Sequence, residues 1–397
     1  MRSVCIIGLG YVGLPLALLC VEKGYTIYGL ENNTKKAEQV QRTYPSILVN
    51  HEKALRSDVI IIAVPTPVDE RKLPDLTAVK EACAAIAGQL DHSGRLIVLE
   101  STVNPFVSRR IILPLFEERG FVEGEDFFLA HCPERIDPGN ARWNVSNIPR
   151  VVGALSDEGL RQVTEFYRAI ISAEILPLSS IEAAEMTKIY ENSYRAVNIA
   201  FANEMAIVMQ NMRIDAKEIV QAVKTKPFGL DICSPSCGVG GHCIPVDPFY
   251  LIDESLKRGF DPSFLRTAMK VNGFMPAYTV SLLMHAMNEI GKSIKGSTIG
   301  ILGVAYKKNV DDVRESPALE IIKKIKSLGG VLKIHDPYIP EYSTSSAAEI
   351  LQCDAVLLLT DHREFLDLDF SRVPVVIDGK NVLDKNRVRG VYKGIGR

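Results

Sequence analysis

The sequence predicts an α/β protein in which two doubly wound domains are joined by a long central helix and a helical region. Three observations lead to this fold class. The chain opens with an apolar run, a glycine turn and a second apolar run, short apolar runs alternate with helical stretches at both ends, and apolar residues recur at helical spacing in the middle. The 397 residues suffice for two or three domains, which we expect at 1–178, 179–290 and 291–397.

The first strand leads into the glycine fingerprint Gly8-Leu9-Gly10-Tyr11-Val12-Gly13, with apolar residues 4–7 before it and 14–19 after it. Strand, turn and helix in this order leave amides at the helix N-terminus free to hold a pyrophosphate. A second strand over residues 25–30 ends at Glu31, where a carboxylate binds a ribose hydroxyl and repels a 2′-phosphate. We therefore expect a Rossmann-like domain that binds NAD rather than NADP. A glycine turn in another kind of α/β protein is the alternative.

Further strands are expected over residues 58–64, 96–100 and 127–130, and residues 151–153 are expected to close the domain. Polar turns that carry Thr66 and Thr102 follow the first two of these strands. Because the carboxyl ends of parallel strands form the ligand crevice, both turns should face the cofactor. The third strand leads into His131-Cys132-Pro133-Glu134-Arg135.

The central region, from Ile181 to Ala286, is expected to be helical, with a loop over residues 227–248. Apolar residues at helical spacing predict a first helix that extends to about Ala222. A helix of this length offers a surface for dimerisation.

The last hundred residues predict a second α/β unit. Strands are expected over 297–303, 331–336, 355–359 and 375–378, with a helix over 317–328. This region lacks a full glycine fingerprint, so we expect no second dinucleotide site, and a nucleotide of another kind stays open.

Composition excludes several functions. The net charge of −2, without basic runs, gives no reason to expect nucleic acid, and no apolar run reaches the roughly 18 residues of a membrane-spanning helix. The N-terminus enters the first strand at once, which leaves no room for a signal peptide. The eight cysteines form no CxxC pairs, so we expect reduced thiols in a cytoplasmic protein and no metal site.

One cysteine, Cys243, stands in the glycine-rich segment 238–247 and is a candidate nucleophile, although a cysteine in such a loop is more often structural. Lys188 and Asn192 lie four residues apart and so share one face of the central helix, near Glu185 and Thr187. This polar group could be a solvated helix edge or could line a reaction site.

Eight segments carry a resemblance over nearly the whole chain. They are residues 8–13, 64–67, 100–103, 133–135, Lys188 with Asn192, Asn203-Glu204, 238–247 and 313–316. In this order they resemble the nucleotide-sugar 6-dehydrogenases, the UDP-glucose/GDP-mannose dehydrogenase family. Within the family, residues 133–140, 191–200 and 241–245 are most similar to the enzymes that act on UDP-N-acetylhexosamines.

The resemblance implies oxidation of a sugar C6 alcohol to a carboxylate with two NAD+ in succession, for the synthesis of surface polysaccharide or glycan precursors. It implies that Cys243 carries a thiohemiacetal and then a thioester, and that Lys188 and Asn192 stabilise the oxyanion. Glu134 is then the general base for hydrolysis, with Asp247 and Thr102 positioning the water. A cation such as Lys188 would also raise the thiolate fraction of Cys243.

The length of the central helix predicts a homodimer formed through it, and the resemblance adds ligand contacts. The expected NAD contacts are Gly8, Gly10, Tyr11, Val12, Gly13, Glu31, Thr66, Thr102 and Arg314. The expected UDP-sugar contacts are Glu134, Arg135, Lys188, Asn192, Gly240, Gly241, Tyr306 and Lys307. Without the resemblance, Arg314 is better explained as a surface ion-pair partner of Asp311 or Asp312.

The chain departs from the family in three places, one of which is the short stretch 44–56. Pro235-Ser236-Cys237 replaces a proline-glycine-proline segment before the nucleophile, and Lys380 stands where relatives have an arginine. Cys237 is either inert or able to form a regulatory disulfide with Cys243, and Cys233 poses the same question. Lysine lacks the bidentate fork of arginine. His242 is interpreted as a loop or substrate contact rather than a base.

Three alternatives stay open. UDP-glucose is the alternative substrate. A two-electron β-hydroxyacid dehydrogenase would need neither Cys243 nor the C-terminal unit, and a silent NAD-binding regulator would need no catalytic set. The sequence does not distinguish UDP-N-acetylglucosamine from UDP-N-acetylmannosamine.

Overall fold

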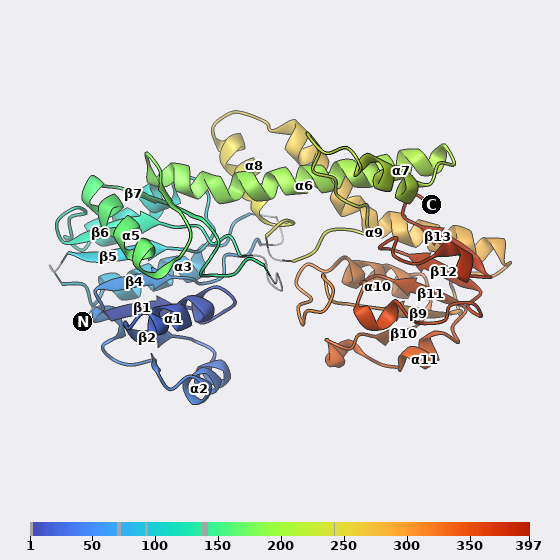
Figure 1. Cartoon of the computed structure of the whole chain (residues 1–397), viewed down its shortest axis with the longest axis horizontal. Helices are drawn as coiled ribbons and strands as arrows, with labels where there is room; N and C mark the ends of the chain where they lie inside the picture. The colour runs from blue at the N-terminus through green and yellow to red at the C-terminus, as the bar shows by residue number, and fades with distance from the viewer. Residues whose placement is uncertain (1–2, 70–72, 92–93, 137–141, 242) are drawn as a thin grey trace. The chain divides into compact units, whose positions relative to one another are not determined.

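The computed structural model describes residues 3–69, 73–91, 94–136, 142–241 and 243–397 (Figure 1). It contains two compact units. The first consists of Met1–Glu191 with Phe249–Phe260, and the second of Asn192–Pro248 with Asp261–Arg397. The long helix α6, Ile181–Asn211, begins in the first unit and ends in the second.

The described part of the first unit contains one sheet of eight strands in the order β3-β2-β1-β4-β5-β6-β7-β8. Strands β1 to β6 run parallel, and β7 is antiparallel to β6. The strands are β1 Ser3–Ile7, β2 Thr26–Leu30, β3 Ile47–Val49, β4 Val59–Ile62, β5 Arg95–Leu99, β6 Phe127–His131, β7 Arg150–Ala154 and β8 Ile175–Pro177.

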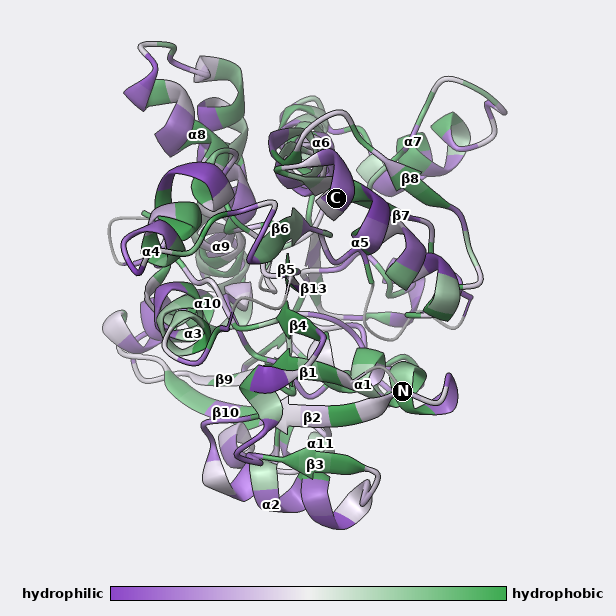
Figure 2. Cartoon of the chain, turned by 90° about the vertical axis from the view of Figure 1, so that its left-hand side faces the viewer, coloured by the Kyte–Doolittle hydropathy of each residue, from purple (hydrophilic) through white to green (hydrophobic). Residues whose placement is uncertain are grey.

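Helices cover both faces of this sheet because successive strand residues point to opposite sides. Val59 and Ile61 of β4 pack in one core with α1 (Gly13–Glu22) and α5 (Asp157–Ile170). Ile60 and Ile62 pack in a second core with α3 (Thr77–Ala87) and α4 (Leu113–Glu117). Figure 2 shows this patterning as apolar green along β4 and hydrophilic purple along much of α5.

The strands predicted in this region are confirmed, with one correction. Residues 151–153 do not close the unit, because α5 and β8 follow them and extend the sheet. The strand order reverses between β1 and β4, so the turns after these strands lie at the same edge. This is the edge at which open α/β sheets bind ligands.

The prediction that the central helix extends to about Ala222 is wrong. Helix α6 ends at Asn211, and Arg213 adopts a left-handed conformation with φ of 60°. A new helix, α7 (Ala216–Val223), then begins, with the Asp215 side chain accepting a hydrogen bond from the Lys217 amide at 2.9 Å. The expected loop then runs to α8 (Asp247–Lys257). None of the described helices is long and apolar enough to cross a membrane.

The described part of the second unit has one parallel sheet in the order β10-β9-β11-β12-β13. Its strands are β9 Thr298–Leu302, β10 Val331–His335, β11 Ala355–Leu358, β12 Val375–Asp378 and β13 Val391–Gly394, and its main helices are α9 Ser263–Glu289 and α10 Pro317–Ser327. The four predicted strands and the predicted helix α10 are confirmed, whereas β13 was not foreseen. The order reverses between β9 and β11, which places the loop after β9 at the expected ligand edge.

Candidate active site

The turn after β1 has the geometry of a dinucleotide site. Gly8 has φ of 95°, and a Cβ there would lie 2.6 Å from the Ala63 carbonyl oxygen. A Cβ on Gly13 would lie 2.0 Å from the carbonyl oxygen of Gly8. At Gly10 the nearest atom to an added Cβ is Lys36 Nζ, at 3.8 Å. Packing therefore requires glycine at Gly8 and Gly13, whereas Gly10 leaves room for a pyrophosphate to approach the backbone.

Glu31 lies directly after β2 and next to this turn. Its carboxylate accepts hydrogen bonds from the amides of Leu9 at 3.3 Å and Asn33 at 3.1 Å, and it pairs with Lys36 at 3.0 Å. Burial opposes ionisation, but the Asn33 amide and Lys36 outweigh it and lower the pKa of Glu31. An ionised carboxylate here suits the ribose hydroxyls of NAD and repels the 2′-phosphate of NADP. Sequence reasoning did not find Lys36, because a single lysine on a polar helix gives no signal.

Glu134 and Lys188 form a buried ion pair in the first unit, with Nζ 3.5 Å from Oε2. Only 9% of Glu134 and 6% of Lys188 are exposed. Burial raises the pKa of Glu134, and the positive charges of Lys188 and Arg150 partly oppose this shift. The other oxygen, Oε1, has no hydrogen-bond partner among the described residues. The pair thus presents a carboxylate suited to proton transfer.

The segment that carries Thr102 is fixed at both ends by buried carboxylates. Glu100 accepts hydrogen bonds from Arg150 at 2.7 Å and from the Tyr167 hydroxyl. Glu185, one turn before Lys188, accepts the amides of Phe106 at 2.6 Å and Ser108 at 2.9 Å. The interpretation of these α6 residues as a solvated edge is therefore wrong, since Glu185, Lys188 and Asn192 are all buried.

Two other expected ligand residues in the first unit have protein partners. Thr66 is buried, and its carbonyl accepts a hydrogen bond from the Tyr250 hydroxyl. Arg135 pairs with Glu191 at 2.5 Å and donates to the Pro149 carbonyl at 2.9 Å. Tyr11 in the fingerprint turn is 56% exposed.

In the second unit the structure brings Cys243, Asn192 and Asp247 together. The Asn192 amide donates to Asp247 Oδ2 at 2.5 Å, and the Cys243 carbonyl accepts the Asp247 amide at 2.8 Å. Asn192 and Asp247 are buried, whereas Cys243 is a partly exposed residue with a free thiol. This is an arrangement in which a thiol can meet a ligand beside fixed polar groups. His242 lies outside the described residues.

The glycines before Cys243 are required by close packing against the loop after β9. A Cβ on Gly240 would lie 2.6 Å from Tyr306 Cβ, and one on Gly241 would lie 2.8 Å from the Tyr306 ring. The Gly241 amide also donates to the Arg314 carbonyl at 2.9 Å. Tyr306, with Lys307 next to it in the chain, therefore adjoins the nucleophile loop. Arg314 makes the ion pair with Asp312, at 2.7 Å, that the sequence offered as its alternative role.

The turn after β9 resembles the turn after β1 but differs in the surroundings of its carboxylate. Gly303 has φ of 90°, but Asp336, at the end of β10, accepts the amides of Val304 at 2.6 Å and Ala305 at 2.8 Å. His362 Nε2 lies 3.1 Å from the same carboxylate. Burial is outweighed by these hydrogen bonds, which lower the pKa of Asp336 to about 2. Both carboxylates accept amides of the protein, but the Asp336 side chain is fully buried, whereas that of Glu31 is 12% exposed.

Comparison with known proteins identifies the family. Residues 48–171, 182–273 and 300–385 match, respectively, the NAD binding, central and UDP binding domains of the UDP-glucose/GDP-mannose dehydrogenase family. The chain is 30% identical over 420 residues to the UDP-N-acetyl-D-mannosamine dehydrogenase of Pyrococcus horikoshii, covering 99% of each chain. The chain belongs to the UDP-glucose/GDP-mannose dehydrogenase family.

Other similarities agree with this family. The chain is 31% identical to the UDP-N-acetyl-D-glucosamine 6-dehydrogenase of Pseudomonas aeruginosa, over 97% of this chain and 98% of that protein. The solved structure of the Pyrococcus horikoshii UDP-D-ManNAc dehydrogenase superposes with a TM-score of 0.93 at 29% identity, covering 100% of this chain and 99% of the other. Residues 3–87 also match the coenzyme F420-dependent NADP oxidoreductases, a match limited to the start of the dinucleotide domain. The protein is thus an NAD-dependent UDP-sugar dehydrogenase.

Cys237, which departs from the family pattern, is packed rather than reactive in this dehydrogenase. It is fully buried, its amide donates to the Gly379 carbonyl at 2.8 Å, and its thiol lies 3.7 Å from the Leu359 carbonyl. Burial raises its pKa. These contacts favour the inert interpretation over a disulfide with Cys243. Cys233 is half-buried, and burial raises its pKa as well.

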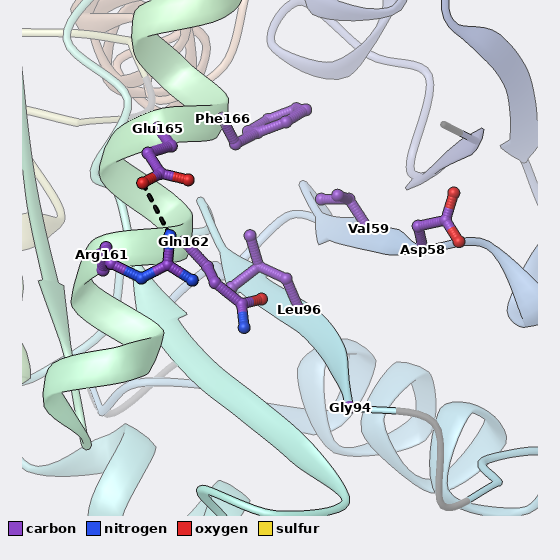
Figure 3. Close-up of a pocket in the computed structure, with 8 residues that line it drawn as sticks. All are labelled: Asp58, Val59, Gly94, Leu96, Arg161, Gln162, Glu165 and Phe166. Carbon is purple, nitrogen blue, oxygen red and sulfur yellow. Dashed lines mark hydrogen bonds and ion pairs between the residues drawn. The ribbon is translucent and has the colours of Figure 1, made fainter. Parts of the chain in front are cut away.

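The first unit of the dehydrogenase also has a hollow of about 500 Å³, which none of the residues expected to bind a ligand lines (Figure 3). It is bordered by Asp58 and Gly94, which directly precede β4 and β5, and by Arg161 and Glu165 of α5. It therefore opens at the amino ends of the strands, opposite to the edge where open α/β sheets bind ligands. Arg161 is paired with Glu158 and Glu165. Among the described residues, no cluster of three or more histidine, cysteine or carboxylate side chains is placed to hold a metal ion.

Proposed function

We propose that this dehydrogenase oxidises the C6 hydroxyl of a UDP-N-acetylhexosamine to the uronate in two steps, through a covalent adduct on Cys243. The observation that carries the proposal is the junction of the partly exposed Cys243 with Asn192 and Asp247. A thiol held beside fixed polar groups suits capture of a carbonyl carbon. The uronate would serve as a precursor for surface polysaccharide or glycan synthesis.

The choice of sugar rests on the relatives. The proteins from Pyrococcus horikoshii and Pseudomonas aeruginosa are named for UDP-N-acetyl-D-mannosamine and UDP-N-acetyl-D-glucosamine. These two sugars differ only in configuration at C2, and either fits the proposal. UDP-glucose is the alternative, since a UDP-glucose dehydrogenase from Pyrobaculum islandicum superposes with a TM-score of 0.89 at 26% identity.

The residues around the first turn suit the cofactor. Gly8, Gly10 and Gly13 would admit the pyrophosphate, and Glu31 would bind the ribose, with Tyr11, Val12, Thr66, Thr102 and Arg314 as further contacts. When bound, NAD+ accepts a hydride from the sugar carbon. Two molecules in succession account for a four-electron oxidation.

Side chains of the protein stabilise the developing charge and form the covalent adduct. In the first step, C6 loses a hydride to NAD+ and its hydroxyl loses a proton to solvent, which gives an aldehyde, and the Lys188 ammonium stabilises the oxygen as negative charge develops. The Cys243 thiolate then forms a C–S bond to the aldehyde carbon as the C=O π bond breaks, and the oxygen takes a proton from solvent to become the thiohemiacetal hydroxyl. Loss of a second hydride, with the hydroxyl proton, restores the C=O bond as a thioester.

Hydrolysis completes the reaction. We assign Glu134 as the base that takes a proton from water, which adds to the thioester carbon and breaks the C–S bond. The thiolate of Cys243 is released with the carboxylate. Asp247 and Thr102 would orient the water, and Asn192 would support the oxyanion. Arg135, Gly240, Gly241, Tyr306 and Lys307 are proposed to bind the UDP-sugar.

We further propose a homodimer formed through α6 and a cytoplasmic location. Tyr190, Tyr194 and Phe201 on this helix are 65%, 49% and 63% exposed, and large exposed side chains of this kind mark interaction surfaces. The functional division into 1–178, 179–290 and 291–397 is part of the same proposal.

The test is a panel of nucleotide sugars with NAD+, in which NADH yield and the acid formed are measured. Two NADH per uronate are expected from one UDP-N-acetylhexosamine, and Cys243→Ser should form no uronate. One NADH per sugar without uronate would indicate a two-electron dehydrogenase. Binding of NAD without reduction by any sugar would indicate a silent regulator.

A further inference from the structure

We propose that Asn203 is a positioning residue for the nucleophile, because its carboxamide fixes the segment that leads into the Cys243 loop. The inference deepens the proposed function and rests on it. Asn203 belongs to the Asn203-Glu204 segment, to which the chemistry proposed above gives no role.

The geometry is a chain of three hydrogen bonds within the second unit. The Ser236 amide donates to Asn203 Oδ1 at 2.9 Å, and Asn203 Nδ2 donates to Asn272 Oδ1 at 3.1 Å. Asn272 Nδ2 in turn donates to the Ala196 carbonyl at 2.9 Å. Helices α6 and α9 are thus connected to the residue that lies seven positions before Cys243.

The donor and the acceptor in each of these three hydrogen bonds are unambiguous. A backbone amide can only donate and a backbone carbonyl can only accept, so Ser236 and Ala196 fix the orientation of both carboxamides between them. An aspartate at position 203 would keep the bond to Ser236 but would direct a second acceptor at Asn272 Oδ1. A near-isosteric change would therefore replace an attraction by a repulsion.

The burial of Asn203 and Asn272 indicates that their side-chain amides serve the hydrogen bonds that they make. Asn203 is fully buried and Asn272 is 6% exposed, and both stand in helix interiors, where asparagine is a poor helix former. A buried amide is costly unless it is hydrogen-bonded. If packing were the only requirement, an apolar residue would suffice at either position. The two asparagines are therefore best explained by the hydrogen bond to the Ser236 amide.

The same segment is supported at neighbouring points. The Ser236 hydroxyl donates to the Gly238 carbonyl at 2.9 Å, which tightens the turn into the glycines. Pro276, one turn after Asn272 on α9, lies 3.4 Å from where a Gly238 Cβ would stand. Helix α9 therefore meets the segment directly at Gly238 and through Asn203 at Ser236.

A loosened segment should affect aldehyde capture before it affects the first oxidation. The first step needs no C–S bond, whereas capture needs the thiol within reach and aligned. Misplacement of a reacting group by about 1 Å costs about 100-fold in rate. Free aldehyde should then escape instead of becoming uronate.

The experiment measures uronate and escaped aldehyde with UDP-N-acetylhexosamine, NAD+ and an alkoxyamine, which converts free aldehyde to an oxime. We expect Asn203→Asp to raise the oxime yield about tenfold and to lower kcat for uronate, with KM for NAD+ unchanged. Asn272→Ala, which keeps the bond between Asn203 and Ser236, should have a smaller effect in the same direction. If Asn203→Asp does not fold, the aldehyde released by Asn272→Ala tests the inference in its place.

Ala286→Gly is the control, because it weakens α9 about four turns beyond Asn272, away from the segment. If both asparagine variants release no more aldehyde than this control, the inference is wrong. Failure of the proposed function has a different result: Cys243→Ser would then still make uronate, whatever the Asn203 variants do.

Discussion

Cys237 lies against Gly379, with its backbone amide 2.8 Å from the Gly379 carbonyl oxygen. Cys237, which precedes the nucleophile loop, is therefore in contact with the residue that precedes Lys380. A Cβ on Gly379 would lie 3.1 Å from Cys237 Cβ and 3.3 Å from its sulfur. The cysteine packs this closely because its neighbour has no side chain.

Gly379→Ala should destabilise the protein, because the added methyl would also lie 2.9 Å from the Leu358 carbonyl. We expect a loss of about 1–3 kcal/mol in the free energy of unfolding, measured by denaturant titration. Cys237→Ala in the same protein should recover part of the loss by freeing space. Gly273→Ala is the matched control, because it adds a methyl to an exposed helix position with no atom within 4 Å. An equal effect of both alanines would contradict the proposed packing.

Gly10→Ala and Gly13→Ala should separate cofactor binding from folding. The Gly10 methyl meets only Lys36 Nζ at 3.8 Å, so this variant should keep its melting temperature but bind NAD at least about tenfold more weakly. The Gly13 methyl would lie 2.0 Å from the Gly8 oxygen and should disrupt the fold itself. Calorimetry and NAD titration check both outcomes. Unchanged NAD affinity in Gly10→Ala would place the pyrophosphate elsewhere.

Glu134→Gln should stop the reaction after the second hydride transfer, because glutamine keeps the shape but cannot act as a base. We expect a burst of two NADH per active site, followed by a steady rate lower by about 10²–10⁴. Mass spectrometry should then find the sugar acyl group on Cys243. Steady turnover at the normal rate would remove Glu134 from its proposed role.

In the wild-type protein, the fall of the hydrolysis rate at acid pH should report protonation of Glu134. Burial raises the pKa of Glu134, and Lys188 opposes the shift. A base works only when deprotonated, so hydrolysis slows as pH falls through this raised pKa. Accumulation of the acyl adduct at acid pH, followed by mass spectrometry, is the measurement.

Asp336→Asn should weaken both stability and UDP binding. The folded-state pKa of Asp336 is lowered from 3.8 to about 2, so its charge contributes stability that is fully present above about pH 4 and is lost as pH falls towards 2. The shift corresponds to about 2 kcal/mol at neutral pH. Because Asp336 holds Val304 and Ala305 beside Tyr306, UDP affinity should fall more than NAD affinity.

The control for this experiment is Asp369→Asn, an exposed aspartate that accepts the Ser371 amide. Solvent screens such a site, so the variant should resemble the wild type. Denaturation of the wild type, Asp336→Asn and Asp369→Asn is measured at pH 7 and at pH 3. If Asp336→Asn unfolds with the same pH dependence as the wild type, the carboxylate does not carry the charge assigned to it.

Much of the fold could be predicted because buried parallel strands are continuous apolar runs. β4, β5 and β9 are of this type, and each was found close to its observed bounds. The end of α6 was missed because apolar spacing continues through Ile214 and Ile219, whereas the backbone turns at Arg213. Local periodicity does not report a single left-handed residue.

The site was predicted as a set of residue types but not as a set of contacts. Cys243 and Lys188 were identified by resemblance, yet nothing local indicated that Asn192 donates to Asp247 or that Glu134 faces Lys188. Both pairs join residues more than fifty positions apart. Lys36 and Asn203 were given no role for the same reason, since their partners are set by tertiary folding.

The closed turn around Asp336 also has a kinetic consequence. A domain with the architecture of a dinucleotide binder could take up the coenzyme where the sugar nucleotide belongs, and NAD would then inhibit at high concentration. Here Asp336, which follows β10 as Glu31 follows β2, is fully buried against Val304, Ala305 and His362, and Ala305 carries a methyl where the first turn has Gly10. We expect saturating NAD to leave the apparent affinity for the sugar nucleotide unchanged, so that each ligand competes only with its own analogues.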